Sequence, residues 1–249
     1  LNHACLLDGA QLSGAELKRY PHADVAAAAR QFASRGEAAA LLATDGVFSM
    51  DGDVAPLRAL AELCAREQAT LMVDDAHGLG VLGGGAGTSK LFPDARIDLH
   101  MGTLSKAVGG YGGYVCATAP VIELIRMRAR TLVYTTGLPP ASVAAALAAL
   151  DVIADEPERV AAPLAKARRF TAALNLRDAQ SAIVPIVLGE AETALAAAAA
   201  LEAQGLLVVP IRPPTVPAGT ARLRVAFTAG HPDEAVDRLA GAIRPWLAR

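Results

Sequence analysis

Two short runs typical of β-strands are each followed by a cluster of polar residues, and this pattern constrains the fold more than any other feature. The runs are Leu71–Val73 and Ile97–Met101, and the clusters are Asp74–Gly78 and Gly102–Lys106. In an open α/β sheet, polar residues that follow the strands lie at the edge where ligands bind. The pattern therefore predicts an α/β sheet with one ligand site built from both clusters.

The two clusters supply an acid, an imidazole and an amine. Asp74, His77 and Lys106 together suit pyridoxal phosphate, which forms a Schiff base with a lysine while a carboxylate keeps its pyridinium nitrogen protonated. A single lysine in such a loop is more often a solvated surface residue. Asp74, Asp75 and His77 could instead ligate a metal, but the sequence offers no convincing further ligands, so we expect no metal.

A glycine-rich run, Gly83–Lys90, resembles a phosphate-binding loop in composition. A P-loop requires Gly-Lys-Ser/Thr in that order after the spaced glycine, whereas this run ends in Gly-Thr-Ser-Lys. We therefore expect the run to be a flexible surface connection.

Four segments taken in order make a family resemblance specific. They are Thr44–Asp53, Val73–Gly78, Gly102–Lys106 and Ile211–Arg224. The series resembles the α-oxoamine synthase family of fold type I pyridoxal phosphate enzymes, and the resemblance covers essentially the whole chain. It implies an α/β fold with a mostly parallel sheet, flanking helices and a small α+β C-terminal domain.

The resemblance implies three catalytic residues. Lys106 would form the Schiff base with pyridoxal phosphate and, once the substrate displaces it, would act as the general base. Asp74 would pair with the pyridinium nitrogen. His3 would stack on the pyridine face and also contact the substrate.

The resemblance assigns further residues to the cofactor. His77 and Ser49 match residues near its phenolic oxygen, and Thr103 matches a phosphate contact. Thr136 matches a residue that reaches a cofactor phosphate across a dimer interface. Thr135 carries the same hydroxyl, so on chemistry alone the choice between these two threonines stays open.

Two residues near the C-terminus are assigned to the substrate. Thr215 matches a substrate contact in a proline-stiffened loop, and Arg224 matches the arginine that holds the carboxylate of the amino acid. A planar guanidinium suits that bidentate contact. Arg222 and Arg224 alternate on one predicted strand and so face the same side, which by itself is usually a solvated surface.

The implied reaction is a decarboxylative condensation of L-alanine with a pimeloyl thioester, carried by a coenzyme or a carrier protein, in biotin biosynthesis. A homodimer with shared active sites is implied as well. Glycine C-acetyltransferase, 5-aminolevulinate synthase and serine palmitoyltransferase share the lysine and the fold, and remain alternatives. A different alternative is a catalytically silent fragment.

Composition excludes several other classes of function. A chain of 249 residues with 53% hydrophobic residues can bury a large core, and a net charge of −2 gives no footprint for nucleic acid. No apolar run is long enough for a membrane span. The three cysteines, Cys5, Cys64 and Cys116, are odd in number and unpatterned, which favours a reducing cytoplasm.

The family resemblance implies two domains, a cofactor-binding domain over 1–155 and a small domain over 156–249, and Pro157 marks a change of direction near their boundary. The expected strands are 41–44, 70–73, 99–101, 113–117, 182–188, 206–211 and 222–227, and the expected helices are 56–67, 120–130, 142–155, 158–174, 192–204 and 233–247.

The chain opens at Leu1, without an initiator methionine and inside what resembles a family motif. We expect about a third of a full-length family member to precede this point, including part of the sheet and an arginine for the acyl substrate. On that basis we expect this chain alone to be a poor catalyst.

Overall fold

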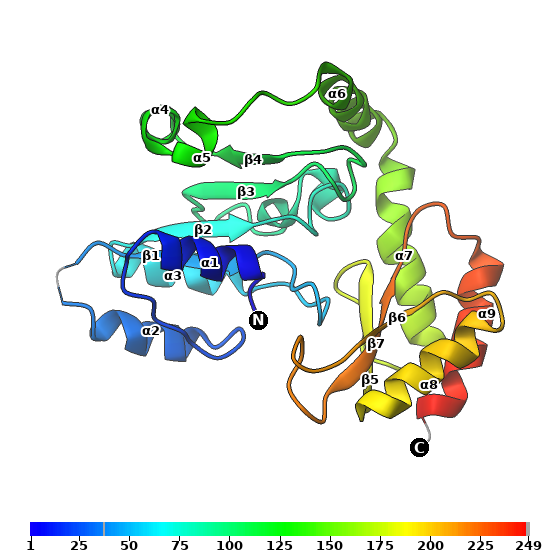
Figure 1. Cartoon of the computed structure of the whole chain (residues 1–249). Coiled ribbons are helices and arrows are strands. Elements are labelled where there is room, and N and C mark those ends of the chain that lie inside the picture. The colour runs from blue at the N-terminus through cyan, green and yellow to red at the C-terminus, as the bar shows by residue number, and fades with distance from the viewer. Residues whose placement is uncertain (37, 248–249) are drawn as a thin grey trace. The chain divides into compact units, whose positions relative to one another are not determined.

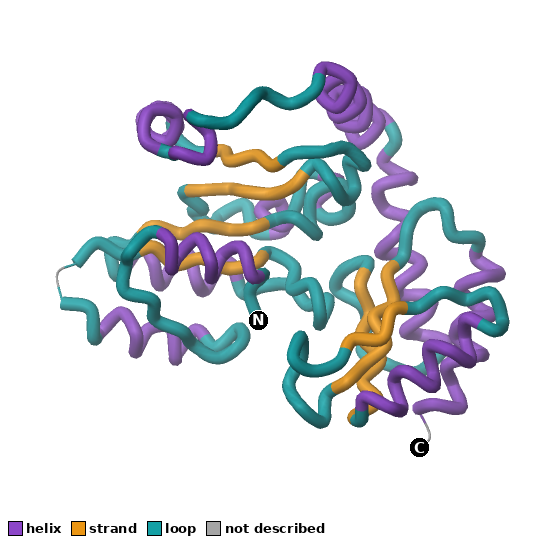
Figure 2. The backbone as a smooth tube through the Cα atoms, in the orientation of Figure 1, coloured by secondary structure: helices purple, strands orange, loops and turns teal. Residues whose placement is uncertain are grey.

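The computed structural model describes residues 1–36 and 38–247 and divides them into two units (Figures 1 and 2). The first unit consists of Leu1–Phe48 and Val54–Pro157. The second consists of Ser49–Asp53 and the residues from Glu158 on. A five-residue segment early in the chain therefore belongs with the C-terminal part.

The first unit is built on a four-stranded sheet in the order β1-β2-β3-β4. β1 (Leu41–Asp45), β2 (Thr70–Asp74) and β3 (Leu99–Thr103) are parallel, and β4 (Gly113–Cys116) runs antiparallel to β3. All four strands lie where the sequence predicts them. Because the first three strands are parallel, their carboxyl ends share one edge of the sheet, and all the polar clusters lie there.

The helices between these strands follow the apolar pattern of the sequence. α3 (Leu57–Arg66) joins β1 to β2 and buries Leu60, Leu63 and Cys64, which recur at helical spacing, against β2. α2 (Val25–Ala33) packs on α3 and is capped by Asp24, whose carboxylate accepts a hydrogen bond from the Ala27 amide at 2.8 Å. One apolar core fixes β1 and β2 in place.

The remaining helices of the first unit are α1 (Ala4–Leu12), α4 (Ala119–Arg128), α5 (Arg130–Val133) and α6 (Pro140–Asp155). The sequence analysis predicted α6 as a helix over 142–155. It also predicted a single helix over 120–130, most of which is α4. It did not predict α1 or α2, which lie in a stretch with few large apolar residues. Among the described residues, no helix combines the length and the apolarity needed to cross a membrane.

The second unit is a three-stranded antiparallel sheet in the order β5-β7-β6. Its strands are β5 (Ile183–Gly189), β6 (Val209–Ile211) and β7 (Ala221–Ala226). β6 is shorter than expected, because residues 206–208 form a connection before the strand.

Three helices accompany this sheet: α7 (Pro157–Ala173), α8 (Ala191–Glu202) and α9 (Asp233–Leu247). Phe170, Leu201 and Ile243, one from each helix, are fully buried with Leu223 of β7 in a single core. The alanine-rich stretch over α8 is thus a packed helix, since Ala194 and Ala197 are completely buried.

The glycine-rich run is a correction to the sequence analysis. The expected surface connection instead forms two short 3₁₀ helices, Gly83–Gly85 and Thr88–Leu91. Thr88 is fully buried and its backbone and hydroxyl both donate hydrogen bonds to Asp75. The run is therefore anchored inside the first unit, and its composition alone could not reveal the buried partner.

Candidate active site

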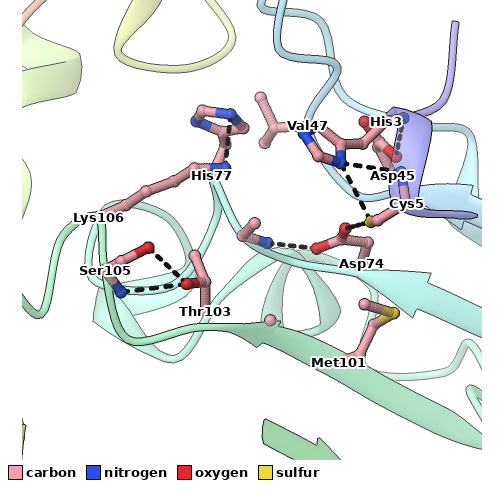
Figure 3. A pocket seen from close by; sticks show the side chains of 12 residues that line it. His3, Cys5, Asp45, Val47, Asp74, His77, Met101, Thr103, Ser105 and Lys106 are labelled. Atoms are coloured by element: carbon pink, nitrogen blue, oxygen red, sulfur yellow. Dashed lines mark hydrogen bonds between the residues drawn. The ribbon is translucent and has the colours of Figure 1, made fainter. Parts of the chain in front are cut away.

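A pocket lies at the carboxyl ends of the parallel strands of the first unit (Figure 3). The twelve residues that line it are His3, Cys5, Asp45, Val47, Asp74, Ala76, His77, Met101, Gly102, Thr103, Ser105 and Lys106. Five residues that the sequence analysis assigned to the cofactor are among them. The loops after β2 and β3 therefore meet, as the arrangement of the strands requires.

Lys106 and His77 form a polar contact between the two loops. Lys106 Nζ lies 3.0 Å from His77 Nε2. The lysine is exposed, whereas the histidine is half-buried. An amine held beside an imidazole, and open to the pocket, is placed to bind a carbonyl compound and to exchange protons with its surroundings.

Asp74 ends β2 and is almost fully buried, with 6% of its surface exposed. Its Oδ1 accepts a hydrogen bond from the Ala76 amide at 3.0 Å, and Oδ2 lies 3.9 Å from Cys5 Sγ. The first contact fixes the carboxylate at the start of the loop that carries His77. This arrangement places a largely buried carboxylate in the lining of the pocket.

His3 enters the pocket from the start of α1. It is the N-cap of that helix, and its Nδ1 accepts a hydrogen bond from the Cys5 amide at 3.3 Å. Its own amide donates to Asp45 Oδ1 at 3.0 Å. The side chain of the preceding residue, Asn2, donates a hydrogen bond to the Ala43 carbonyl at 2.8 Å. Two residues of β1 therefore bind the segment that carries His3.

Sequence reasoning assigned no role to two ionisable residues of the pocket, Asp45 and Cys5. Asp45 is the last residue of β1 and lies directly opposite Asp74 in the register of the parallel pair. Burial, reinforced by the charge of Asp74, raises the pKa of Asp45 to about 6. Burial and the same carboxylate also raise the pKa of the Cys5 thiol. The position of Asp45 at a strand end was the signal that could have identified it.

Replacement of Asp45 by asparagine should stabilise the first unit in a pH-dependent way. Because its pKa in the folded state is about 6 and its ordinary value is 3.8, the folded protein binds the proton more tightly than the unfolded chain. The contribution of Asp45 to the free energy of unfolding therefore falls as the pH rises from about 4 to about 6, by about 3 kcal/mol at most. Asparagine removes this penalty and still accepts the bond from His3.

Thermal unfolding at pH values of about 4.5 and 7.5 tests this expectation. The gain from Asp45→Asn should be present at the higher pH and largely absent at the lower one. Asp94→Asn, which removes an exposed carboxylate, serves as the matched control. An equal effect of Asp45→Asn at both pH values would contradict the assigned protonation.

The hydroxyl groups of Thr103 and Ser105 form a small network at the other end of the pocket. Their oxygens lie 2.7 Å apart, and Thr103 Oγ1 also accepts a hydrogen bond from the Ser105 amide at 3.1 Å. Thr103 Oγ1 also donates a hydrogen bond to the Gly112 carbonyl at 3.1 Å. A hydroxyl pair and a backbone amide near a lysine suit an anionic group such as a phosphate.

Four assigned residues do not line this pocket. Ser49, Thr215 and Arg224 belong to the second unit, and Thr136 is an exposed residue of the first. Arg224 Nε donates to the Ser49 carbonyl at 2.5 Å, and burial lowers the pKa of its guanidinium. Their roles remain predictions.

Arg222 and Arg224 face the same side of β7, as expected, and both contact the segment Ser49–Asp53. Arg222 is buried and donates to Asp51 Oδ1 at 2.6 Å and to the Met50 carbonyl at 3.3 Å. The two arginines thus attach the short segment to the sheet of the second unit.

Comparison with known families identifies this arrangement. The profile of the family described as aminotransferase class I and II matches residues 1–243. The chain belongs to the class I and II aminotransferase family. A relative from Phenylobacterium zucineum is 62% identical over 253 residues, which span 99% of this chain and 64% of the relative. A protein from Methylocella silvestris named 8-amino-7-oxononanoate synthase is 61% identical over 98% of this chain and 70% of its own length.

Solved structures agree with the assignment to the class I and II aminotransferase family. Serine palmitoyltransferase from Sphingomonas wittichii superposes with a TM-score of 0.93 at 33% identity, over 98% of this chain and 64% of that one. The 8-amino-7-oxononanoate synthase of Francisella tularensis superposes with a TM-score of 0.83 at 28% identity, over 99% and 73%. The chain therefore spans about two thirds of the length of the proteins that it matches.

The pocket fits pyridoxal phosphate, the cofactor of the class I and II aminotransferase family. Lys106 would supply the amine, the buried Asp74 would supply a carboxylate for a ring nitrogen, and the hydroxyl groups of Thr103 and Ser105 would face a phosphate. The metal alternative loses support, because both oxygens of Asp75 are bonded to Thr88 instead of facing Asp74 and His77.

Proposed function

We propose that this protein condenses L-alanine with a pimeloyl thioester to give 8-amino-7-oxononanoate, a step of biotin biosynthesis, with pyridoxal phosphate as the cofactor. The observation that carries the proposal is the pocket that unites Lys106, His77, Asp74 and His3 in one unit of the fold. Relatives about 60% identical over nearly the whole chain are named for this reaction.

The proposed chemistry forms one carbon–carbon bond and breaks three bonds: the Cα–H bond, the acyl C–S bond and the bond from the α-carbon to the carboxylate. Pyridoxal phosphate, when bound, withdraws electrons from the α-carbon of the amino acid. That carbon loses a proton and attacks the acyl carbonyl, the sulfur leaves and is protonated to the thiol, the carboxylate departs as carbon dioxide, and the α-carbon takes up a proton in its place. The overall reaction is balanced without an oxidant or a reductant.

Lys106 is proposed to hold the cofactor and then to move the proton of the α-carbon. The contact of 3.0 Å between its Nζ and His77 Nε2 keeps the amine directed into the pocket. Asp74 would keep a positive charge on the ring nitrogen, and its buried position makes that interaction strong. His3 would cover the ring face from the start of α1.

The second unit is proposed to contribute the contacts to the amino acid. Arg224 would bind its carboxylate and Thr215 would contact the same substrate, while Ser49 would join His77 near the phenolic oxygen. Arg224 has one nitrogen bonded to Ser49 and keeps its two terminal nitrogens for a carboxylate in this assignment.

We also propose a homodimer in which Thr136 reaches the phosphate of the partner's cofactor. Exposed apolar side chains support a covered surface over α4, α5 and α6: Leu124, Met127, Leu132, Val133, Tyr134, Leu138, Val143, Leu147 and Leu150. The three free cysteines are consistent with action in the cytoplasm.

A second candidate is another synthase of the same type, because serine palmitoyltransferase is also a structural neighbour. Incubation of the protein with pyridoxal phosphate and L-alanine, glycine or L-serine, each with pimeloyl, acetyl and palmitoyl thioesters, separates the candidates. Mass spectrometry of the products should show 8-amino-7-oxononanoate from alanine and the pimeloyl donor, at least about tenfold above the other pairs. Preferred use of glycine or serine would contradict the proposal.

A further inference from the structure

Asp75 is a buried carboxylate whose role the proposed chemistry does not explain. It follows Asp74 in the chain, yet it does not line the pocket. Its Oδ2 accepts a hydrogen bond from the Thr88 amide at 2.7 Å, and its Oδ1 accepts one from the Thr88 hydroxyl at 2.8 Å. Both residues are buried, with 5% of Asp75 and none of Thr88 exposed.

Three glycines enclose this carboxylate. A Cβ atom added at Gly78 would lie 2.0 Å from Asp75 Oδ1, and one added at Gly87 would lie 1.9 Å from Oδ2. A Cβ atom at Gly46 would lie 2.8 Å from Oδ1 and 2.4 Å from the Thr88 hydroxyl. Cβ atoms essentially never approach within 3.0 Å of another heavy atom, so each of these glycines leaves space that the carboxylate occupies.

The three glycines come from different segments of the first unit. One follows β1, one lies in the turn after β2, and one belongs to the glycine-rich run between the two 3₁₀ helices. The Asp75 carboxylate is therefore the point at which these segments meet. The glycine-rich run supplies Thr88 at this point and no residue to the pocket.

The same aspartate shapes the turn that carries the pocket residues. Its carbonyl accepts hydrogen bonds from the amides of Gly78 and Leu79, both at 3.0 Å, and its amide donates to the Met101 carbonyl at 2.8 Å. Asp74 lies immediately before it, and His77 lies within the turn. Fixing the Asp75 side chain consequently restricts the positions of both.

We propose that Asp75 is a positioning residue that holds the turn from Asp74 to Gly78 in place through Thr88. It acts on pyridoxal phosphate only through Asp74 and His77, and in this respect the inference rests on the proposed function. The glycine-rich run is then the anchor for this turn. Alanine at position 75 removes both acceptors. Asparagine would not, because its oxygen can accept from the Thr88 amide while its NH₂ group donates to the Thr88 hydroxyl oxygen.

Three variants and one control test this inference. Thr88→Val removes the hydroxyl bond to Asp75 but keeps the shape of the side chain and the bond from the backbone amide. It is therefore the smallest change that breaks a contact between the two residues. Asp75→Ala removes both acceptors and the charge, and Thr88→Ser keeps the hydroxyl as the conservative variant. Ser89→Ala removes the neighbouring hydroxyl of the same run and is the matched control.

The first measurement is amide hydrogen exchange in the cofactor-free protein. Loss of hydrogen bonds between positions 75 and 88 should speed the exchange of the amides of residues 76–79 by about 10- to 100-fold in Thr88→Val and Asp75→Ala. Ser89→Ala and Thr88→Ser should remain near wild type. Unchanged exchange in both bond-breaking variants would overturn the inference, whether or not the protein binds the cofactor.

The second measurement is titration with pyridoxal phosphate, followed by the pH profile of the visible absorption band. We expect the two bond-breaking variants to bind about tenfold or more weakly and to shift the profile, and Thr88→Ser to behave like the wild type. Variants that melt at a lower temperature but keep affinity and profile would reduce Asp75 to a purely structural role. A wild-type protein that does not bind the cofactor would contradict the proposed function instead.

Discussion

Replacement of Lys106 by alanine is expected to abolish covalent capture of pyridoxal phosphate and to slow proton exchange at the α-carbon of L-alanine by about 100- to 10,000-fold. The lysine supplies the amine of the pocket, and His77 beside it cannot form the same bond to a carbonyl. Two measurements check this outcome: trapping of the cofactor by borohydride, and the exchange of the alanine α-hydrogen followed by NMR in D₂O. Neither requires an acyl donor.

Lys90→Ala is the matched control for this experiment, because that lysine is exposed on the second 3₁₀ helix and does not line the pocket. It should retain both trapping and exchange. If Lys106→Ala still yielded a borohydride-stable adduct at one defined site, the lysine would have been assigned to the wrong role.

Replacement of Asp74 by asparagine should leave the cofactor bound but slow the same exchange by about 100- to 1,000-fold. The amide has the shape of the carboxylate and still accepts the bond from the Ala76 amide. It carries no charge, so it cannot hold a proton on the ring nitrogen by an ion pair. The exchange rate and the equilibrium affinity for the cofactor, measured together, separate these two effects.

Asp45→Asn is the sharpest comparison, because Asp45 lies opposite Asp74 and both carboxylates line the pocket. We expect it to change the exchange rate by less than about tenfold, since its carboxylate is bonded to the amide of His3. If the two substitutions slowed exchange equally, the choice of Asp74 over its neighbour would be wrong.

The sequence predicted the framework of the site because that framework follows from local patterns. Polar residues after two apolar runs had to meet once those runs paired as parallel strands, and Lys106 and His77 do lie together. The family resemblance added His3, which no periodicity would have selected. The direction of β4 was not predictable from its own residues, because a run of four residues carries no pattern that depends on the direction of the strand.

What the sequence could not reveal depends on contacts between distant segments. Asp45 and Cys5 enter the pocket through the register of β1 and the start of α1, and the place of Asp45 at a strand end was the single local signal for either residue. The glycine-rich run was interpreted wrongly for the same reason. Gly87 is needed because a buried carboxylate, Asp75, lies against it, and no pattern within the run encodes that partner.

Neither unit is one continuous stretch of sequence, so neither could be transferred to another protein as a single segment. The chain leaves the first unit after Phe48, returns at Val54 and leaves again after Pro157, so three peptide connections join the units. A polypeptide that began at Glu158 would lack Asp51 and would leave the buried Arg222 without its carboxylate, at a cost of about 3 to 5 kcal/mol. Recombination at a single crossover near residue 157 would therefore bring together an arginine and a segment that had not evolved as partners.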